Sequence, residues 1–452
     1  MAEKTATSAD PRRPDRAAAP APEPTAPAAG TRLSRMASGL HGSEILKIAA
    51  EIRAMAAAGQ RICNLTVGDF DPRQFPIPDF LRDAITQAVQ AGETNYPPSD
   101  GVLALRQSVQ RFLKRELALD YPLEGILVTG GSRPAIYGTY RALVDPGDVV
   151  VYPTPSWNNN HYCHQVGAVE RAVACSPQES FLPTRARLAE AVKGARLLAL
   201  NSPLNPSGTA FSAKVLAELC DVVLEENRRR GPSERPLYVM YDQVYWMLTF
   251  GRGLDGVDHV TPIGLRPEMR PFTIFVDGIS KAFCATGLRV GWAFGPSDVI
   301  GAMSNLLGHV GAWAPRPEQV AAAKLLDRAD LIRAYHDVQK KAMQARLEAL
   351  HAGMNALKRD GFAVDALQPI GAIYLTARFA LAGQRTKEGQ LLRTNEEIRR
   401  YLLAAAGCAI VPFQAFGARD EDGWFRLSIG AVSLAEIEAM FPRLRAALAA
   451  LS

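Results

Sequence analysis

The fold is decided by residues 272–281, FTIFVDGISK, in which the apolar run FTIFV is followed by DGIS and then by Lys281. The apolar run has the composition of a buried strand, so Lys281 follows the end of that strand. Eight residues later, Arg289 stands between glycines in GLRVG. A fixed lysine suits a Schiff base to an aldehyde, and the arginine suits a phosphate on the same molecule. Taken alone, Lys281 is more simply a solvated surface charge.

Three other apolar runs end in polar clusters of the same kind. The clusters are GGSR at 130–133, NSPLNPSG at 201–208 and YDQVY at 241–245. In open α/β sheets, ligands bind outside the carboxyl ends of the strands. The strand ends therefore predict that one edge of a sheet carries Ser132, Asn205, Asp242, Tyr245 and Lys281.

Strands and helices alternate from about residue 78 to about residue 330. A helix expected at 212–226, for instance, lies between two of the apolar runs. This alternation predicts a mostly parallel sheet with helices on both faces. A long amphipathic helix is expected at 331–360, followed by strands at 371–376 and 409–412.

The first 32 residues are predicted to be a disordered leader. The first 30 contain 10 Ala and 6 Pro mixed with charges, so they cannot bury apolar surface. They lack the apolar core of a secretory signal, and their acidic residues argue against a transit peptide. Order is expected to begin near Leu33, with a helix capped by Ser43 and ended by Gly59, and then a strand at 62–65.

The bulk composition is that of a soluble globular protein. Of the 452 residues, 48% are hydrophobic and 21% charged, and no run approaches the ~18–20 apolar residues of a membrane span. The net charge of +5 is small and scattered, so neither a nucleic acid nor a membrane is expected as a partner. The six cysteines show no metal or redox spacing, which predicts free thiols in a reducing cytoplasm and no metal site.

Taken together, the clusters resemble the class I and II aminotransferases, the aspartate-aminotransferase-like enzymes of pyridoxal phosphate (PLP) fold type I. The resemblance is carried by NSPLNPSG, YDQVY, SKAFCATGLRVG at 280–291 and WFRLS at 424–428. It runs from about Leu33 to the C-terminus. As a set in this order the four segments are highly specific, although each alone is weak.

The resemblance implies an α/β fold with two domains. A large three-layer domain at 78–330 would hold a mostly parallel seven-stranded sheet and bind PLP. A smaller α+β domain would combine the N-terminal segment 33–77 with residues 331–452. The working form would be a homodimer with shared active sites.

The turn at 130–133 is the expected phosphate site. Free N–H groups and the dipole at the start of the following helix favour an anion. We expect Gly131, Ser132 and Arg133 in this turn, and Arg289 would add a bidentate guanidinium. The alternative for the turn is an ordinary strand-to-helix connection.

Two further phosphate contacts are implied by the resemblance. Tyr96, in NYPP at 95–98, would reach the phosphate from a neighbouring subunit. The family often has a serine three residues before the lysine, where this chain has Gly278. Ser280 is expected to compensate, and phosphate affinity is the property that the change affects.

The resemblance also assigns the contacts of the PLP ring. Asp242 would face the pyridine nitrogen and keep it protonated, which makes the ring an electron sink. Asn205 and Tyr245 would hydrogen-bond its phenolic oxygen, and Trp157 would stack on its face. An aromatic residue in such a loop is otherwise more often part of the core.

Substrate contacts are expected near the C-terminus. Arg426 lies in an apolar strand and needs an anionic partner. The resemblance makes that partner the substrate α-carboxylate, with the Gly68 N–H and Asn205 as further substrate contacts, and the alternative is an internal salt bridge. Phe413 stands where a glycine is common and would narrow the substrate pocket.

The predicted activity is a ping-pong amino transfer between an L-amino acid and a 2-oxo acid such as 2-oxoglutarate. Lys281 would hold PLP and then move the α-proton, with Asp242 and Tyr245 as its catalytic partners. Asn158, Asn159 and Asn160 are candidates for the side-chain pocket. Arg316, near Trp313, would either read a second carboxylate, which favours aspartate, or form an interface salt bridge.

Two alternatives remain open at this level. A PLP-dependent lyase or synthase would use the same lysine, aspartate and arginines, because the sequence does not show which α-bond lies perpendicular to the ring. A non-catalytic ligand-sensing module would need a separate DNA-binding domain. The leader is too short and too rich in proline to supply one.

Overall fold

The computed structural model describes residues 32–40, 44–250, 259–419 and 421–452. Of these, residues 32–40 belong to one unit, and the described residues from 44 onwards belong to a second. In the first unit, helix α1 (Arg35–Gly39) begins after Ser34, whose hydroxyl accepts a hydrogen bond from the Ala37 N–H. The predicted leader, apart from Arg32, and the predicted cap Ser43 lie outside the described residues.

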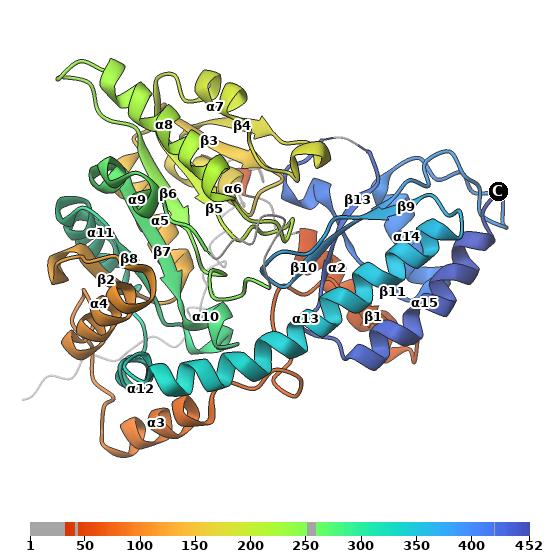
Figure 1. The fold of residues 1–452 in the computed structure, drawn as a ribbon, viewed down its shortest axis with the longest axis horizontal. Coiled ribbons are helices and arrows are strands. Elements are labelled where there is room, and N and C mark those ends of the chain that lie inside the picture. The colour runs from red at the N-terminus through yellow and green to blue at the C-terminus, as the bar shows by residue number, and fades with distance from the viewer. Residues whose placement is uncertain (1–31, 41–43, 251–258, 420) are drawn as a thin grey trace, which may run out of the picture. The chain divides into compact units, whose positions relative to one another are not determined.

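In the second unit, seven strands of the described residues form one mostly parallel sheet, as the alternation predicted (Figure 1). The order is β2-β8-β7-β6-β5-β3-β4, and β8 (Gly291–Phe294) runs antiparallel to both of its neighbours. The other strands are β2 (Ile126–Thr129), β3 (Val149–Thr154), β4 (Val169–Ala174), β5 (Ala195–Asn201), β6 (Tyr238–Asp242) and β7 (Thr273–Gly278). The predicted seven-stranded sheet is therefore confirmed.

Helices pack on both faces of this sheet. Side chains of β7 alternate between two cores, with Phe275 in one and Ile274 and Val276 in the other, as the two-residue period of a strand requires. One core includes residues of α4 (Leu103–Leu117), α7 (Arg185–Ala191), α8 (Ala213–Arg229), α9 (Pro262–Leu265) and α12 (Arg316–Leu326), beside which α3 (Asp79–Gln90) packs. The other includes residues of α5 (Ser132–Leu143), α6 (Asn159–Val166) and α11 (Ser297–Val310).

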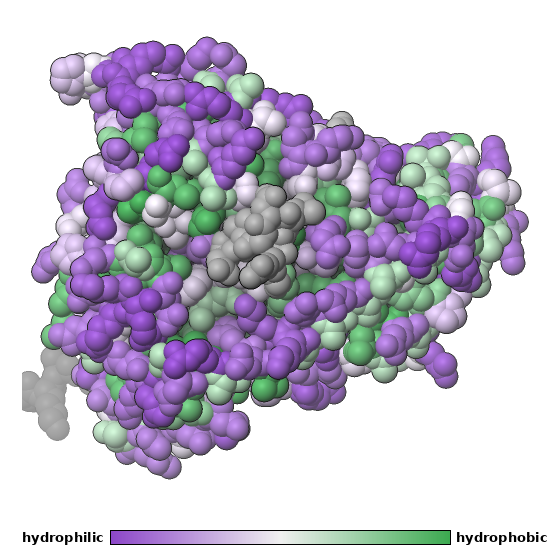
Figure 2. Space-filling model, viewed as in Figure 1, coloured by the Kyte–Doolittle hydropathy of each residue, from purple (hydrophilic) through white to green (hydrophobic). Residues whose placement is uncertain are grey.

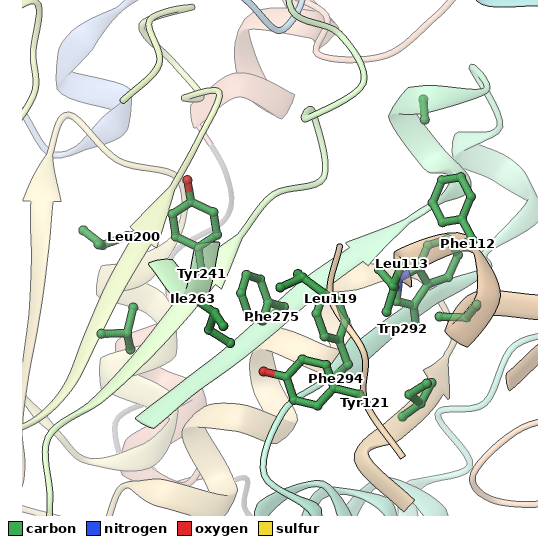
Figure 3. Close-up of a cluster of buried hydrophobic side chains, with 14 of the residues drawn as sticks. Phe112, Leu113, Leu119, Tyr121, Leu200, Tyr241, Ile263, Phe275, Trp292 and Phe294 are labelled. Carbon is green, nitrogen blue, oxygen red and sulfur yellow. The ribbon is translucent and has the colours of Figure 1, made fainter. Parts of the chain in front are cut away.

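Aromatic side chains fill the first of these cores at the β7–β8 edge (Figure 3). Phe275 and Phe294 stack with their ring centroids 4.5 Å apart, and the Tyr121 ring meets Phe294 edge-on at 5.3 Å. Trp292, also on β8, meets Phe112 of α4 edge-on at 6.4 Å. Because these rings are almost fully buried, they fix the antiparallel strand β8 against β7.

A second group of strands is built from the two ends of the second unit. β10 (Tyr374–Phe379) pairs antiparallel with β13 (Trp424–Ser428) and β9 (Val364–Ala366), and β12 (Val411–Pro412) pairs with β13. β1 (Cys63–Asn64) pairs parallel with β11 (Cys408–Ala409), which ties the N-terminal segment to the C-terminal one. This smaller α+β part agrees with the predicted fold class, while the domain boundaries at 77/78 and 330/331 stay predictions.

Four helices accompany these short strands (Figure 1). They are α2 (Glu44–Ala57), α13 (Ala329–Arg359), α14 (Asn395–Ala406) and α15 (Leu434–Ala449). The long helix α13 packs against α12 at one end and against α15 and β9 further along. It therefore links the large sheet to the smaller group of strands.

On the face shown in Figure 2, hydrophobic residues are scattered among hydrophilic ones. Across the described ranges, no helix has both the length and the apolar character needed to cross a bilayer.

Three glycines let β8 pack directly on the turn between β2 and α5. A Cβ on Gly291 would lie 2.5 Å from the Gly131 carbonyl carbon and 2.7 Å from the Ser132 nitrogen. A Cβ on Gly278, which pairs with Gly291, would lie 2.8 Å from the Val290 oxygen. A serine at position 278 therefore has no room in this chain, because β8 occupies the space of its side chain.

Candidate active site

A cavity of about 710 Å³ lies at the carboxyl ends of the parallel strands. The predicted site residues that line it are Gly68, Ser132, Arg133, Trp157, Asn205, Asp242, Tyr245, Ser280, Lys281, Arg289 and Arg426. The structure thus brings the polar clusters together at one edge of the sheet, as the strand ends predicted. The binding role of each residue stays a prediction.

Lys281 lies in the short helix α10 (Ile279–Ala282), directly after β7. Its Nζ donates a hydrogen bond to the Gly68 carbonyl oxygen at 2.5 Å and lies 5.7 Å from the centre of the Tyr245 ring. Burial lowers the pKa of Lys281 to about 8, against a partial opposing effect of Asp69. Near neutral pH a fraction of this amine is consequently unprotonated and can act as a base or nucleophile.

The Arg289 guanidinium lies against the turn that begins α5. Gly131 has a left-handed backbone with φ 91°, and a Cβ there would collide with the Arg289 guanidinium. Arg289 donates to the Thr286 oxygen at 2.7 Å and to the Gly130 oxygen at 3.0 Å. Burial is the main cause that holds the pKa of Arg289 below its ordinary value. Gly131 itself does not line the cavity, but it allows the guanidinium to reach the helix start.

Asp242 ends β6, and its carboxylate is half-buried at the cavity. Its Oδ1 accepts a hydrogen bond from the Val244 N–H at 3.1 Å. Burial raises the pKa of Asp242 to about 6, while Lys281 opposes that rise. Among the described residues, no basic side chain forms an ion pair with Asp242, so its carboxylate suits a cationic group that enters the cavity.

The loop at 201–208 is tied to β6 through Asn201. The Asn201 side chain donates to the Asp242 carbonyl oxygen at 2.8 Å and accepts from the Asn205 N–H at 2.8 Å. This arrangement fixes Asn205 beside the cavity. The Asn205 amide oxygen then accepts a hydrogen bond from Arg426 at 3.1 Å.

Arg426 is fully buried on β13, with 1% of its surface exposed. It donates to the Thr66 oxygen at 2.6 Å, and its guanidinium carbon lies 4.6 Å from the Tyr374 ring centre. Its Nε has no acceptor in the described part of the chain, and no carboxylate there forms an ion pair with it. The expected alternative of an internal salt bridge is therefore not seen among these residues, and the guanidinium is left able to bind an anion.

Trp157 and Arg133 form the wall next to β3. The Arg133 guanidinium carbon lies 5.4 Å from the Trp157 ring centre, and the Trp157 ring lies 6.3 Å from the Phe416 ring. Of the three asparagines considered for the side-chain pocket, Asn159 lines the cavity. Its amide oxygen accepts a hydrogen bond from the Tyr140 hydroxyl at 2.9 Å.

Two expectations for the substrate pocket need revision. Phe413 is 1% exposed and packs on Phe181, with ring centres 5.0 Å apart, so the expectation that it narrows the cavity is wrong. Arg316 forms an ion pair at 2.5 Å with Glu93 of the same chain. The guanidinium is therefore already satisfied by a carboxylate within its own subunit.

Tyr96 does not line the cavity of its own chain. It is 83% exposed and meets the Trp313 ring edge-on, with centroids 5.8 Å apart. An exposed tyrosine beside a tryptophan is available to a neighbouring subunit. That role stays a prediction.

The sequence analysis assigned no role to three residues near the site. Asp69 and Tyr374 line the cavity. Asp277 lies behind it, buried on β7, where it accepts hydrogen bonds from Trp246 at 2.8 Å and Gln243 at 3.3 Å. Burial raises the pKa of Asp277 to about 7. It ties β7 to the turn that carries Asp242 and Tyr245, a link that local spacing does not reveal.

These features define an α/β enzyme. Its cavity combines the Lys281 amine, the Asp242 carboxylate and three arginines, Arg133, Arg289 and Arg426, which form no ion pair with a carboxylate of the described ranges. Residues 60–444 match the family model described as aminotransferase class I and II. The chain is 32% identical to the aspartate aminotransferase of Rhizobium meliloti (strain 1021) over 93% of this chain and 97% of that protein. It is 28% identical to the aspartate/prephenate aminotransferase of Thermus thermophilus over 85% of this chain and 92% of that protein.

Solved structures agree with this assignment. The aspartate aminotransferase of Rhizobium meliloti superposes with a TM-score of 0.84 at 30% identity, over 93% of this chain and all of that chain. The structure of the Thermus thermophilus aspartate aminotransferase with maleate has a TM-score of 0.80 at 27% identity, over 92% of this chain and 99% of that chain. The chain belongs to the class I and II aminotransferases, and it is an aminotransferase.

The lowered pKa of Lys281 predicts a pH-dependent stability. Because the folded pKa of about 8 lies below the unfolded value of roughly 10.4, the unfolded chain binds more protons between these values. The charged amine therefore destabilises the cofactor-free fold at pH 7, and this penalty fades as the pH rises to 10.5. Lys281→Met should raise the unfolding free energy by on the order of 1–3 kcal/mol at pH 7 and by much less at pH 10.5.

Urea unfolding of the cofactor-free proteins at both pH values measures this difference. Lys358→Met is a matched control, because Lys358 lies on the surface in an ion pair with Asp365. It should give no gain at pH 7. Equal destabilisation by both substitutions at both pH values would contradict the buried, weakly basic amine.

Proposed function

We propose that this aminotransferase uses PLP to move an amino group between an L-amino acid and a 2-oxo acid in a ping-pong reaction. The observation that carries the proposal is that a single cavity is lined by Lys281, by Arg289 beside the start of α5, and by Arg426. A cofactor phosphate would bind at Arg289 and a substrate carboxylate at Arg426.

The residues present fit PLP at every polar group. The N–H groups at the start of α5, the Ser132 hydroxyl and Arg289 suit the phosphate, with Ser280 nearby. The Asp242 carboxylate suits a protonated ring nitrogen, and Lys281 suits the aldehyde. Because β8 leaves no room for a side chain at position 278, we propose that Ser132, Ser280 and Arg289 hold the phosphate without a serine there.

The ring is supported by three further side chains. Trp157 lines the wall where it can stack on the ring face, and Asn205 and Tyr245 line the side expected for the phenolic oxygen. When bound, the cofactor supplies a sink for the electrons released at the substrate α-carbon. These three residues bind and orient it.

The chain's own residues then position the substrate and move one proton. Arg426 binds the α-carboxylate, because the Nε of Arg426 has no acceptor in the described chain. The Gly68 N–H assists. Lys281 Nζ, once released from its hydrogen bond to the Gly68 oxygen, would take the proton from the substrate α-carbon and hold it for return. The aromatic faces of Tyr374 and Phe416 keep water from Arg426.

We propose aspartate as the amino donor and 2-oxoglutarate as the acceptor. The relatives named as aspartate aminotransferases support this choice. Arg133 is the basic residue of the cavity that remains for a second carboxylate, because Arg316 is paired with Glu93. A cytoplasmic location is proposed on the basis of the free cysteines and the similar bacterial enzymes.

Replacement of Lys281 tests the proposed function. Lys281→Ala should lower the single-turnover rate with aspartate by at least about 10³-fold, because it removes the amine that is positioned to move the α-proton. Product analysis of the wild type should show one 2-oxo acid per cofactor and no ammonia. Lys324→Ala, on the surface of α12, is the control and should keep the wild-type rate.

Two results would contradict this function. Full activity of Lys281→Ala would exclude the lysine as the proton carrier. Stoichiometric ammonia without formation of a new amino acid would instead indicate the lyase alternative.

We further propose a homodimer in which Tyr96 completes the site of the partner. Lys281→Ala chains and Tyr96→Ala chains, each with little activity alone, should regain activity when mixed and allowed to exchange. Half of the dimers would be hybrids with one intact site, so about a quarter of the wild-type activity is expected. Native mass spectrometry verifies the exchange. A mixture of proven hybrids with no activity above its parents would refute the shared site.

A further inference from the structure

Tyr374 contacts both the residue proposed to bind the cofactor, Tyr245, and the residue proposed to bind the substrate, Arg426. It is buried at the start of β10, and its hydroxyl lies 2.6 Å from the Tyr245 hydroxyl. Its ring lies 4.6 Å from the guanidinium carbon of Arg426. One side chain therefore contacts both the tyrosine expected at the cofactor and the arginine expected at the substrate.

The chain leaves space for this hydroxyl by using a glycine. A Cβ on Gly68 would lie 2.9 Å from the Tyr374 hydroxyl oxygen. The Gly68 carbonyl, in turn, accepts the hydrogen bond from Lys281. Any side chain at position 68 would displace either Tyr374 or the segment that holds Lys281.

The backbone of β10 fixes the position of Tyr374. Tyr374 pairs with Ser428 of β13, and its carbonyl packs so closely on Gly208 that a Cβ there would collide with it. Two residues later, the Thr376 hydroxyl donates to the Ser207 carbonyl at 2.8 Å. The strand is therefore anchored to the loop that also carries Asn205.

Counting donors gives the direction of the bond between the two tyrosines. A tyrosine hydroxyl has one proton to donate. If Tyr245 donates its proton to the phenolic oxygen of the cofactor, it cannot also donate to Tyr374. Tyr374 must then be the donor in the 2.6 Å pair, which gives a chain from Tyr374 to Tyr245 to the phenolic oxygen. In such a chain each hydrogen bond strengthens the next.

We propose that Tyr374 is a positioning residue for the amino transfer. Its hydroxyl acts as the second donor that orients Tyr245, and its ring supports the guanidinium that binds the substrate carboxylate. This inference deepens the proposed function and rests on it.

Four charged groups face the two hydroxyls. They are Arg426 from β13, Lys281 from α10, Asp242 from β6 and Asp69 from the segment before α3. All four are unchanged in the variants below. A difference between these variants therefore reports on the hydroxyls rather than on a neighbouring charge.

The test is a pH titration of the absorbance of the bound cofactor. Tyr374→Phe should raise the midpoint of this titration by about half to one pH unit. Without Tyr374 as donor, Tyr245 makes a weaker hydrogen bond to the phenolic oxygen, so the nitrogen that joins Lys281 to the cofactor keeps its proton to a higher pH. Tyr245→Phe should raise it further. Adding Tyr374→Phe to Tyr245→Phe should then change the midpoint little, since the hydroxyl that Tyr374 orients is absent.

The role of the ring is measured separately with maleate as a probe of carboxylate binding. Tyr374→Leu should weaken maleate binding about tenfold, because it removes the aromatic face beneath Arg426. Tyr374→Phe keeps that face and should bind maleate as the wild type does. Calorimetry on the cofactor-loaded proteins measures both.

Tyr401→Phe is the matched control for the loss of a tyrosine hydroxyl. The Tyr401 hydroxyl donates to the Ala447 carbonyl at 2.7 Å, outside the cavity, so only thermal stability should change. The inference would be overturned by an unchanged midpoint in Tyr374→Phe. It would also be overturned if Tyr374→Phe shifted the midpoint equally in the wild type and in Tyr245→Phe. If instead the proposed function is wrong, the wild-type protein will show no cofactor absorbance to titrate.

Discussion

The structure depends on buried and half-buried positive charges that form no ion pair with a carboxylate of the described residues. Lys281, Arg289 and Arg426 are held mainly by backbone carbonyl oxygens and aromatic faces. Burial lowers the pKa of each, which shows that the protein environment disfavours the charged forms. A fold that retains such groups in a cavity gains from them only when anions enter.

The sheet and its glycines determine where these charges lie. β7 ends next to β6, so Lys281 and Asp242 emerge at the same edge, and the inserted strand β8 brings Arg289 against the start of α5. The close packing of Gly291 on the β2–α5 turn leaves no room for side chains between them. A phosphate bound there would be fixed relative to Lys281 by backbone rather than by mobile side chains.

Much of the site could be predicted because its residues directly follow strands. Each polar cluster comes after an apolar run, and parallel strands place such ends at one edge. Tyr374 could not be found in this way, since its role arises from β10 packing against segments more than 100 residues away. The ion pair Arg316–Glu93 and the burial of Phe413 likewise result from tertiary packing, which local sequence patterns do not predict.

The most direct test of the central claim is to locate the covalent link between protein and cofactor. The wild-type enzyme would be reduced with borohydride, digested and mapped by mass spectrometry. We predict one modified peptide, with the added mass of reduced PLP on Lys281. A link on any other lysine, or none on a catalytically active protein, would contradict the account.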